Sequence, residues 1–380
     1  MKVFYWSPFL SNIATVEAVS KSINSILRYD KNKEIEPHLI DATGEWQLKQ
    51  EKLKNTNIIK LYKNNFYKFL PKGGYFKSRI SQIFIFIFSF RKLKRLIIKE
   101  NPDFLIAHLI ISLPLLLFAF FNFRTKLIVR ISGTPKLNPI RRFFWSLLSK
   151  KIYKVTCPTY STLNKLAEMN VFSRTKLAIL YDPVISAKYI NLKKNEPLDK
   201  KFENTKFILG IGRLTRQKNF ELLIKGYNKI LQYEHDVKLL ILGEGEERSK
   251  IEKLIQKLHL KENVYLLGYK DNVFNYLNRS KCFICSSFYE DPGFVIIEAA
   301  FLNKMVFASD SKTGPTEILN NSERGFLFEN NNYKDLYNKY IEFTKLTKHQ
   351  SYAKLIRLKK YSKNFTLFYH YKSLRDILIS

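Results

Sequence analysis

Short apolar runs alternate with longer segments of helical periodicity through the first half of the chain. Short apolar runs bounded by turn residues predict buried strands, and residues 13–27 predict a helix. Strands that alternate with helices indicate a parallel sheet covered by helices on both faces. The predicted strands are residues 2–7, 36–40, 58–61, 104–109, 126–132 and 154–158.

A polar segment at 178–201, with prolines at 183 and 197, interrupts this alternation and predicts a linker. A second alternation follows it, and residues from about 333 to the end read as helices. The predicted strands are 206–210, 237–242, 264–267, 281–285 and 305–309, and the main helices between them are 219–232, 247–258 and 294–302.

A length of 380 residues suits two domains of about 150–200 residues each. We therefore expect two doubly wound α/β domains, at 1–190 and 198–361. Residues 362–380 are expected to form a helix that could pack back onto the first domain.

Residues 104–123 contain no charged Asp, Glu, Lys or Arg and are long enough to suggest a membrane span. We instead predict a buried strand followed by a helix with Pro114 in its first turn, where proline is tolerated. With the strand after it, this segment forms one βαβ unit.

Residues 74–98 have a different pattern, because basic residues bracket an aromatic and aliphatic run. Such a pattern is typical of an amphipathic helix that lies on anionic lipid. It is equally typical of a core helix with a basic end, and both interpretations stay open.

The formal net charge is +32, of which +22 falls in residues 1–200 (35 Lys and Arg against 13 Asp and Glu). A positive field of this kind attracts phosphates, nucleic acid or an anionic membrane surface. A bias toward Lys, Asn, Ile and Phe in the composition would produce the same excess.

The three cysteines, Cys157, Cys282 and Cys285, make no disulfide framework and fit a reducing compartment. Cys282 and Cys285 have CxxC spacing but lie in an apolar strand-like run, which favours a structural role. The opening residues are strand-like rather than a charged segment before a long apolar stretch, so we expect no signal peptide.

Two carboxylates, Glu290 and Glu298, lie eight residues apart around an Asp-Pro-Gly turn and the predicted start of a helix. The unpaired N–H groups and the dipole of a helix start favour anions. Carboxylates accept hydrogen bonds from hydroxyl groups. The arrangement therefore suits a phosphorylated sugar.

Three strand ends in the second half carry glycines. Residues 210–219 (GIGRLTRQKN) place Arg213 and Lys218 at the mouth of a loop, where they can bind phosphate oxygens. The spacing matches neither a dinucleotide GxGxxG nor a Walker A loop. Gly243 and Gly245 follow the next strand, and Gly268 follows the one after it.

Together and in this order, these motifs resemble the C-terminal domain of retaining GT-B glycosyltransferases of family 4. The match extends over about 120 residues and includes residues 314–318 (GPTEI). The N-terminal half is similar mainly in its rhythm of strands and helices. The resemblance implies a GT-B architecture, with two Rossmann-like domains facing a central cleft. It makes residues 1–190 the acceptor-binding domain and residues 198–361 the donor-binding domain.

The resemblance also implies roles for individual residues. Arg213 and Lys218 would bind the donor diphosphate and stabilise the leaving nucleotide, Glu298 the ribose hydroxyls, and Glu290 the donor sugar. The implied catalytic residues are Glu290, Arg213, Lys218 and His108. The implied donor-binding residues are Gly212, Arg213, Lys218, Gly243, Tyr269, Lys270, Glu290, Gly293, Phe294, Val295 and Glu298, with Tyr269 and Lys270 near the base and the N–H groups of Phe294 and Val295 on the distal phosphate.

The chain departs from the family pattern in two places. Asp291-Pro292-Gly293 replaces the usual glycine-containing triplet after the first glutamate, and Pro292 removes one backbone donor. The loop at residues 7–12 lacks the glycines of the family. His108 closes a predicted strand where such enzymes often place a histidine near the reacting sugar, and Arg130 ends the next strand, where we expect it to face the cleft.

No metal site and no cofactor are expected, since the nucleotide-sugar is a substrate. The chain contains no Asp-x-Asp, the metal-diphosphate motif of the other large glycosyltransferase fold. Cationic side chains and a helix start would supply the positive charge instead.

The resemblance thus implies a metal-independent, retaining glycosyltransferase for surface polysaccharides such as O-antigen, capsule or lipopolysaccharide. It would move a sugar, such as an N-acetylhexosamine or hexose from a UDP-linked donor, to a polyprenyl-diphosphate-linked glycan. We expect a cytoplasmic protein, peripheral on the anionic inner face of the membrane. The alternatives are another GT-B enzyme, such as a sugar-nucleotide epimerase or a phosphorylase, and a charge-driven nucleic-acid-binding protein, which the ordered motifs disfavour.

Overall fold

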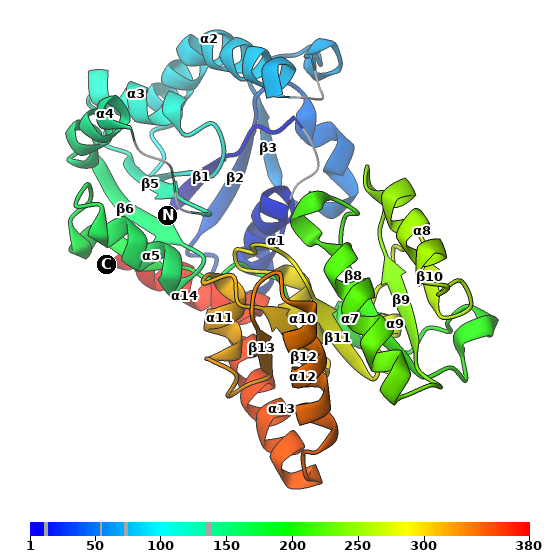
Figure 1. Cartoon of the computed structure of the whole chain (residues 1–380). Helices are drawn as coiled ribbons and strands as arrows, with labels where there is room; N and C mark the ends of the chain where they lie inside the picture. The colour runs from blue at the N-terminus through cyan, green and yellow to red at the C-terminus, as the bar shows by residue number, and fades with distance from the viewer. Residues whose placement is uncertain (11–13, 54, 72–74, 134, 136–137) are drawn as a thin grey trace. The chain divides into compact units, whose positions relative to one another are not determined.

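The computed structural model describes residues 1–10, 14–53, 55–71, 75–133, 135 and 138–380 (Figure 1). The described residues form two compact units, the first made of 1–183 with 367–380 and the second of 184–366. The sequence places the boundary later, between 190 and 198. Residues 11–13 and 74, which belong to predicted segments, lie outside the described residues.

The first unit is built on a parallel seven-stranded sheet with strand order β3-β2-β1-β4-β5-β6-β7. The order reverses between β1 and β4, and in open α/β sheets ligands bind beside such a switch point. The strands are β1 Lys2–Trp6, β2 Glu36–Asp41, β3 Asn57–Lys60, β4 Phe104–Ala107, β5 Lys126–Arg130, β6 Ile152–Cys157 and β7 Leu177–Ile179.

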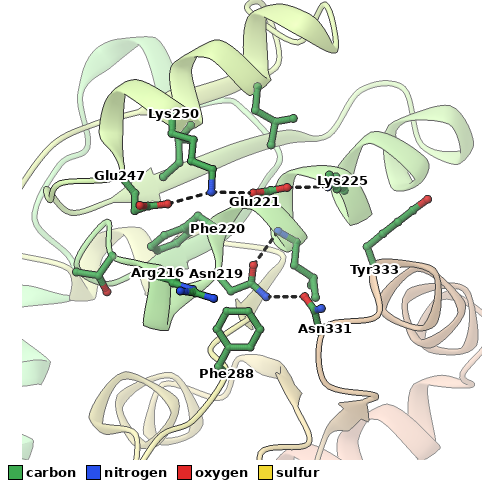
Figure 2. A pocket seen from close by; sticks show the side chains of 14 residues that line it. Arg216, Asn219, Phe220, Glu221, Lys225, Glu247, Lys250, Phe288, Asn331 and Tyr333 are labelled. Atoms are coloured by element: carbon green, nitrogen blue, oxygen red, sulfur yellow. Dashed lines mark hydrogen bonds and ion pairs between the residues drawn. The ribbon is translucent and has the colours of Figure 1, made fainter.

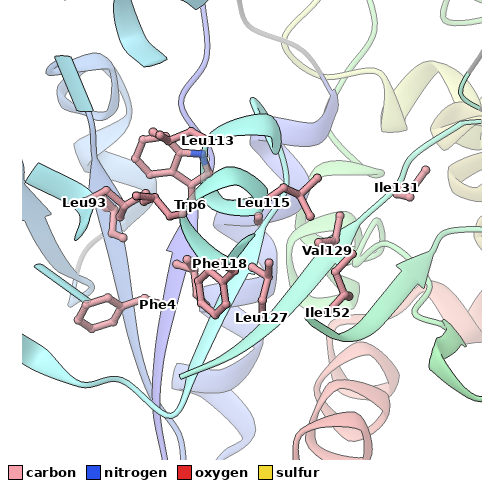
Figure 3. Packing of buried hydrophobic residues seen from close by; sticks show 14 of the residues in the cluster. Phe4, Trp6, Leu93, Leu113, Leu115, Phe118, Leu127, Val129, Ile131 and Ile152 are labelled. Atoms are coloured by element: carbon pink, nitrogen blue, oxygen red, sulfur yellow. The ribbon is translucent and has the colours of Figure 1, made fainter. Parts of the chain in front are cut away.

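Strand β1 shows why its apolar sequence forms a central strand. Phe4 and Trp6 pack in one core cluster, and Val3 and Tyr5 pack in another. Because successive side chains of a strand point to opposite faces, an unbroken apolar run is buried on both sides of the sheet. Figure 3 shows the first of these clusters, in which Phe4 and Trp6 lie with residues of β5 and α3.

Helices cover both faces of this sheet (Figure 1). Helix α14, which follows the second unit in the chain, packs on α1 in the first unit, where Leu374 and Leu378 share a core cluster with Val16 and Val19. The helices are α1 Ala14–Tyr29, α2 Tyr75–Glu100, α3 Ser112–Phe120, α4 Pro139–Ser149, α5 Tyr160–Glu168 and α14 Leu367–Ile379.

The second unit contains a parallel six-stranded sheet with strand order β10-β9-β8-β11-β12-β13. The order reverses here between β8 and β11, so this sheet has a switch point of its own. The strands are β8 Phe207–Ile211, β9 Lys238–Leu242, β10 Val264–Leu266, β11 Cys282–Cys285, β12 Met305–Ser309 and β13 Phe326–Phe328.

The helices of the second unit pack against this sheet and against one another, notably α7 on α12 and α10 on α13. Side-chain caps fix several starts: the Asn219 side chain accepts from the Leu222 N–H at the start of α7, and Thr347 and Gln350 form a capping box on α13. The helices are α6 Ala187–Lys193, α7 Phe220–Tyr233, α8 Arg248–Lys257, α9 Phe274–Arg279, α10 Phe294–Phe301, α11 Gly314–Leu319, α12 Tyr333–Thr344 and α13 Lys348–Ser362.

The expected linker at 178–201 is more ordered than its polar composition suggests. It contains the end of β7 and the whole of α6. Helix α6 belongs to the second unit and packs on α9, and the Asn272 side chain donates to the Lys193 carbonyl at 2.9 Å. Tertiary contacts therefore stabilise a helix that has only one buried residue, Ile190.

Residues 104–123 form strand β4 and helix α3, as predicted, with Pro114 in the first turn of the helix. Within the described residues, no helix is both long enough and apolar enough to cross a bilayer. Helix α2 has a buried apolar side, as a core helix would, and also an exposed apolar side, as an amphipathic helix on lipid would. It buries Ile85, Leu93 and Ile97, yet leaves a second apolar row exposed to solvent.

A candidate donor site in the second unit

Three loops at the carboxyl end of the second sheet are joined by backbone hydrogen bonds. Gly212 N–H donates to the Leu242 carbonyl at 3.0 Å, Leu214 N–H to Glu244 at 2.9 Å, and Gly243 N–H to Gly268 at 2.8 Å. The loops that follow β8, β9 and β10 therefore form one continuous surface at the strand ends.

Glycine is required where these loops touch. A Cβ atom on Gly243 would lie 1.9 Å from the Gly212 carbonyl oxygen, and one on Gly245 would lie 2.3 Å from the Leu214 oxygen. Gly243 also has φ +140°, which side chains disfavour. The Gly-x-Gly turn thus lets the loop that carries Arg213 and Lys218 lie directly on its neighbour.

Lys218 and Glu290 form an ion pair between the loop after β8 and the loop after β11. Both side chains are largely buried, with 19% and 11% of their surfaces exposed. The Ser287 hydroxyl donates to the same carboxylate oxygen at 2.7 Å. Glu290 is therefore held by a charged and a neutral donor, both of which lie in the second unit.

Backbone contacts fix the two loops against each other around this ion pair. The Phe288 N–H donates to the Gln217 carbonyl, and the Ser286 hydroxyl donates to the Lys218 carbonyl, both at 2.9 Å. The orientation of Lys218 relative to Glu290 therefore depends on the loop backbone as well as on the attraction between the charges.

The turn between Glu290 and α10 positions the start of that helix. Gly293 caps it with φ +99°, a conformation natural to glycine. Gly314, at the start of α11, would bring a Cβ atom to 2.1 Å from the Pro292 carbonyl oxygen. The two predicted motifs, Asp-Pro-Gly and Gly-Pro-Thr-Glu, thus pack backbone to backbone.

Helix α10 begins at Phe294, so the first-turn N–H groups of Phe294 and Val295 lie beyond the reach of intrahelical acceptors. Such groups and the helix dipole favour an anion. Glu298 is the fifth residue of the helix and is half-buried. The structure therefore places Glu290 before the helix start and Glu298 within the helix, as the sequence predicts.

The remaining predicted donor residues lie on the same loops with different exposure. Arg213 is exposed two residues after the end of β8, and Tyr269 is 74% exposed after β10. The Lys270 ammonium donates to Asp199 at 3.2 Å, which directs it along the surface of the second unit. Their contact with a nucleotide stays a prediction.

His108 belongs to the first unit. It follows β4, and its backbone N–H donates to the Trp6 carbonyl at 2.9 Å. Its ring stacks on Tyr5 with a centroid distance of 6.0 Å. Burial, and then the nearby positive charge of Arg130, hold the pKa of His108 well below its usual value. His108 is therefore a neutral imidazole at pH 7.

The sequence analysis expects Arg130 to face an open cleft, but the structure buries its side chain. Its side chain is only 2% exposed, and it forms an ion pair with Asp182 at 2.6 Å and donates to the Leu180 carbonyl. A guanidinium buried in this way is held by its partners, because an isolated buried charge is very unfavourable. Arg130 thus has a structural role within the first unit.

Two polar residues at the site were missed by the sequence analysis. Ser287 donates to the Glu290 carboxylate, and the Thr313 hydroxyl donates to the Glu290 carbonyl at 2.6 Å. Ser287 lies three residues before Glu290, and Thr313 directly precedes Gly314. Their positions beside recognised motifs were the available signal, but no spacing rule singles them out.

The two cysteines of the CxxC sequence lie buried in the second unit. Burial, and then the negative charge of Glu290, raise the pKa of the Cys285 thiol to about 11, and burial raises that of Cys282 to about 12. Both thiols are protonated and buried, which fits a structural role. No group of three potential metal ligands from His, Cys, Asp and Glu occurs among the described residues.

Comparison with known proteins gives a direct context for this site. Residues 193–364 match the family described as glycosyl transferases group 1. A 225-residue stretch is 31% identical to the N-acetylgalactosamine-N,N'-diacetylbacillosaminyl-diphospho-undecaprenol 4-alpha-N-acetylgalactosaminyltransferase of Campylobacter jejuni, and covers 57% of this chain and 60% of that protein. The chain matches between 31% and 60% of the length of the first three curated relatives.

Solved structures match over nearly the whole chain. A glycosyltransferase from Rickettsia africae has a TM-score of 0.76 at 18% identity, covering 99% of this chain and 97% of that one. Anabaena Alr3699/HepE, solved in complex with UDP and glucose, has a TM-score of 0.72 at 16% identity, covering 100% and 99%. The fold expected from the sequence, with two parallel α/β sheets, is confirmed. The second unit thus matches the glycosyl transferases group 1 over residues 193–364, and the whole chain has the fold of the GT-B glycosyltransferases.

Proposed function

We propose that the protein transfers a sugar from a UDP-linked donor to a polyprenyl-diphosphate-linked glycan, with retention of the anomeric configuration. The observation that carries the proposal is the Lys218–Glu290 ion pair beside the start of α10. A cation, a carboxylate and unpaired N–H groups lie together there, and this combination suits a phosphorylated sugar.

In this proposal Lys218 binds the donor diphosphate, with Arg213 at the mouth of the same loop and the N–H groups of Phe294 and Val295 on the distal phosphate. The Lys218 ammonium has three donors, so it can bind a phosphate oxygen while it stays bonded to Glu290. As the sugar–oxygen bond breaks, negative charge grows on the leaving UDP, and these donors stabilise it.

Glu290 has the complementary role of orienting the sugar. One of its oxygens accepts from Lys218 and Ser287, and the other can accept from sugar hydroxyl groups. Glu298, on the same helix, would accept from the ribose hydroxyls. Glycines 212, 243 and 293 allow the close approach of the backbone, and Tyr269 and Lys270 would lie beside the base.

We further propose that the reaction needs no metal ion, because the cations and the helix start supply the required positive charge. The relatives support the donor and acceptor classes through their own ligands and names. The Anabaena protein was solved with UDP, and the Campylobacter protein is named for a diphospho-undecaprenol-linked acceptor. His108 is proposed to lie near the reacting sugar as a neutral hydrogen-bonding group.

The acceptor lipid requires access to a membrane, and helix α2 supports a peripheral attachment to the anionic cytoplasmic face. Its exposed apolar side chains recur at helical spacing, so they share one face. The exposed basic residues Arg91, Lys92 and Arg95 follow along the same helix. The exposed apolar row is Phe76, Ile80, Ile83, Phe84, Ile87 and Phe88.

Thermal stabilisation by nucleotides tests the donor site, because a ligand that binds only the folded protein raises the melting temperature. UDP, GDP and ADP are compared, with and without EDTA. The proposal expects stabilisation by UDP that survives EDTA. A cooperative melt that no nucleotide shifts would refute the donor site, and stabilisation that EDTA abolishes would refute metal independence.

A further inference from the structure

A pocket of about 480 Å³ lies in the second unit, outside the ion pair of the donor site. It is bounded by the loop after β8, the first turn of α7, helix α8, Phe288 and the segment leading into α12 (Figure 2). Its volume falls within the range of about 300–1,000 Å³ typical of small-molecule sites. Arg216 and Asn219 line it, whereas Lys218 between them does not.

The charges in the pocket wall are nearly balanced. Lys250 lies 3.3 Å from both Glu221 and Glu247, and Lys225 lies 2.7 Å from Glu221 (Figure 2). With Arg216, three cations face two carboxylates. This near balance favours a neutral ligand over a phosphate, because a phosphate in the pocket would lie beside two carboxylates as well as three cations.

The other groups in the wall supply both polar and apolar contacts. The rings of Phe288 and Tyr333 are half-buried, and the amides of Asn219 and Asn331 lie 3.4 Å apart (Figure 2). Amides and paired charges can both donate to and accept from hydroxyl groups, and aromatic rings pack against C–H surfaces. A sugar ring has hydroxyl groups around its edge and C–H groups on its faces.

We propose that this pocket is a second saccharide-binding site, which holds a neutral sugar unit of the glycan away from the donor site. The proposal rests on the proposed function only in that a growing glycan would supply the sugar unit. Arg216 and Asn219 belong to the same loop as Lys218, so the two sites lie on different parts of one short segment.

Binding of chitobiose, maltose and lactose tests the proposal, by saturation-transfer NMR and titration calorimetry with and without saturating UDP. At least one disaccharide is expected to bind in both conditions. Lys250→Ala and Tyr333→Ala should each weaken that binding about five-fold or more, the effect of one lost hydrogen bond or ring contact. Lys253→Ala, an exposed lysine on α8 outside the pocket, is the matched control.

Three outcomes would overturn the site. The first is that no disaccharide binds, and the second is that both pocket variants bind the disaccharide as well as the control does. The third is that inorganic pyrophosphate displaces the disaccharide, which would make the pocket an anion site. Circular dichroism of each variant establishes that it is folded. UDP binding measured on the same samples separates this result from the proposed function, because a pocket that binds no sugar leaves UDP binding intact.

Discussion

Lys218 and Glu290 are separated by 72 positions in the chain, yet their side chains form an ion pair between two neighbouring loops. Each is largely buried, so each depends on the other for the compensation of its charge. A substrate phosphate that approaches Lys218 would therefore find an ammonium group whose position is already fixed. Preorganised charge of this kind lowers the cost of reorganisation during a reaction.

Lys218→Ala should lower kcat by roughly 10²–10³-fold, comparable to the loss of one donor that stabilises developing charge. The measurement is sugar transfer from the nucleotide-sugar that stabilises the wild-type protein. Lys206→Ala is the matched control, because Lys206 forms an exposed ion pair with Asp236 in the same unit. Near-normal turnover by the Lys218 variant would exclude the diphosphate role.

Gly243→Ala should destabilise the second unit more than Gly268→Ala does. Both glycines have positive φ, which costs alanine about 1–2 kcal/mol. At Gly243 the added Cβ also meets a backbone oxygen at 1.9 Å, whereas at Gly268 it meets only the Glu244 carboxylate at 3.0 Å. The clash should add about 1–3 kcal/mol, measured by urea denaturation. Equal losses would show that the loops can separate freely.

His370 should make the first unit less stable in mild acid. Its Nδ1 donates to the Tyr181 carbonyl at 2.6 Å and its Nε2 lies 2.8 Å from the Ser22 hydroxyl, so a neutral ring protonated on Nδ1 has partners for both nitrogens. Burial lowers its pKa to about 4, below the unfolded value of about 6.5. The unfolded chain therefore binds a proton more readily as the pH falls through this interval.

This linkage predicts that His370 alone removes about 2 kcal/mol of unfolding free energy between pH 7 and pH 5. The stability is fully present above pH 6.5 and is lost progressively toward pH 4. His370→Gln should flatten this part of the pH profile, while His235→Gln, at an exposed position, should leave it unchanged. Identical slopes for wild type and the His370 variant would contradict the prediction.

Reversal of Arg91, Lys92, Lys94 and Arg95 to glutamate should release the protein from anionic vesicles. Each basic residue near such a surface contributes about 1 kcal/mol, so partitioning should fall by roughly 10²–10³-fold in a sedimentation assay. Reversal of four basic residues in the second unit, Lys345, Lys348, Arg357 and Lys360, is the charge-matched control. If both variants lose binding equally, net charge rather than α2 drives the attachment.

The sequence predicted those parts of the fold in which local pattern and tertiary environment agree. Strand β4 is apolar along its whole length and β1 is apolar after Lys2, because both faces of the sheet are covered, so the apolar runs alone identify them. Strands β7 and β13 were not predicted; each has only three residues, and unlike the equally short β10 neither is followed by a recognised glycine turn. Helix α6 was not predicted, because contacts with α9 rather than its own sequence pattern stabilise it.

The candidate site was predictable to the same extent. Gly243 and Gly293 were identified from turn motifs, and the structure shows the close approach and the positive φ that explain them. Ser287 and Arg130 were not predictable, because a hydroxyl or a guanidinium takes its role from the folded geometry of its partners, which no residue spacing reveals. Ser287 meets a carboxylate three residues away through a turn, and Arg130 meets Asp182 across 52 positions.

The return of α14 to the first unit has a consequence for the order in which the chain can fold during synthesis. Leu374 and Leu378 fill a core beside Val16 and Val19, but the ribosome makes them only after all of residues 184–366. The apolar face of α1 therefore stays uncovered in the nascent first unit while the second unit is translated. Since that surface is open to premature association, folding of the first unit is expected to be completed after translation has passed the second.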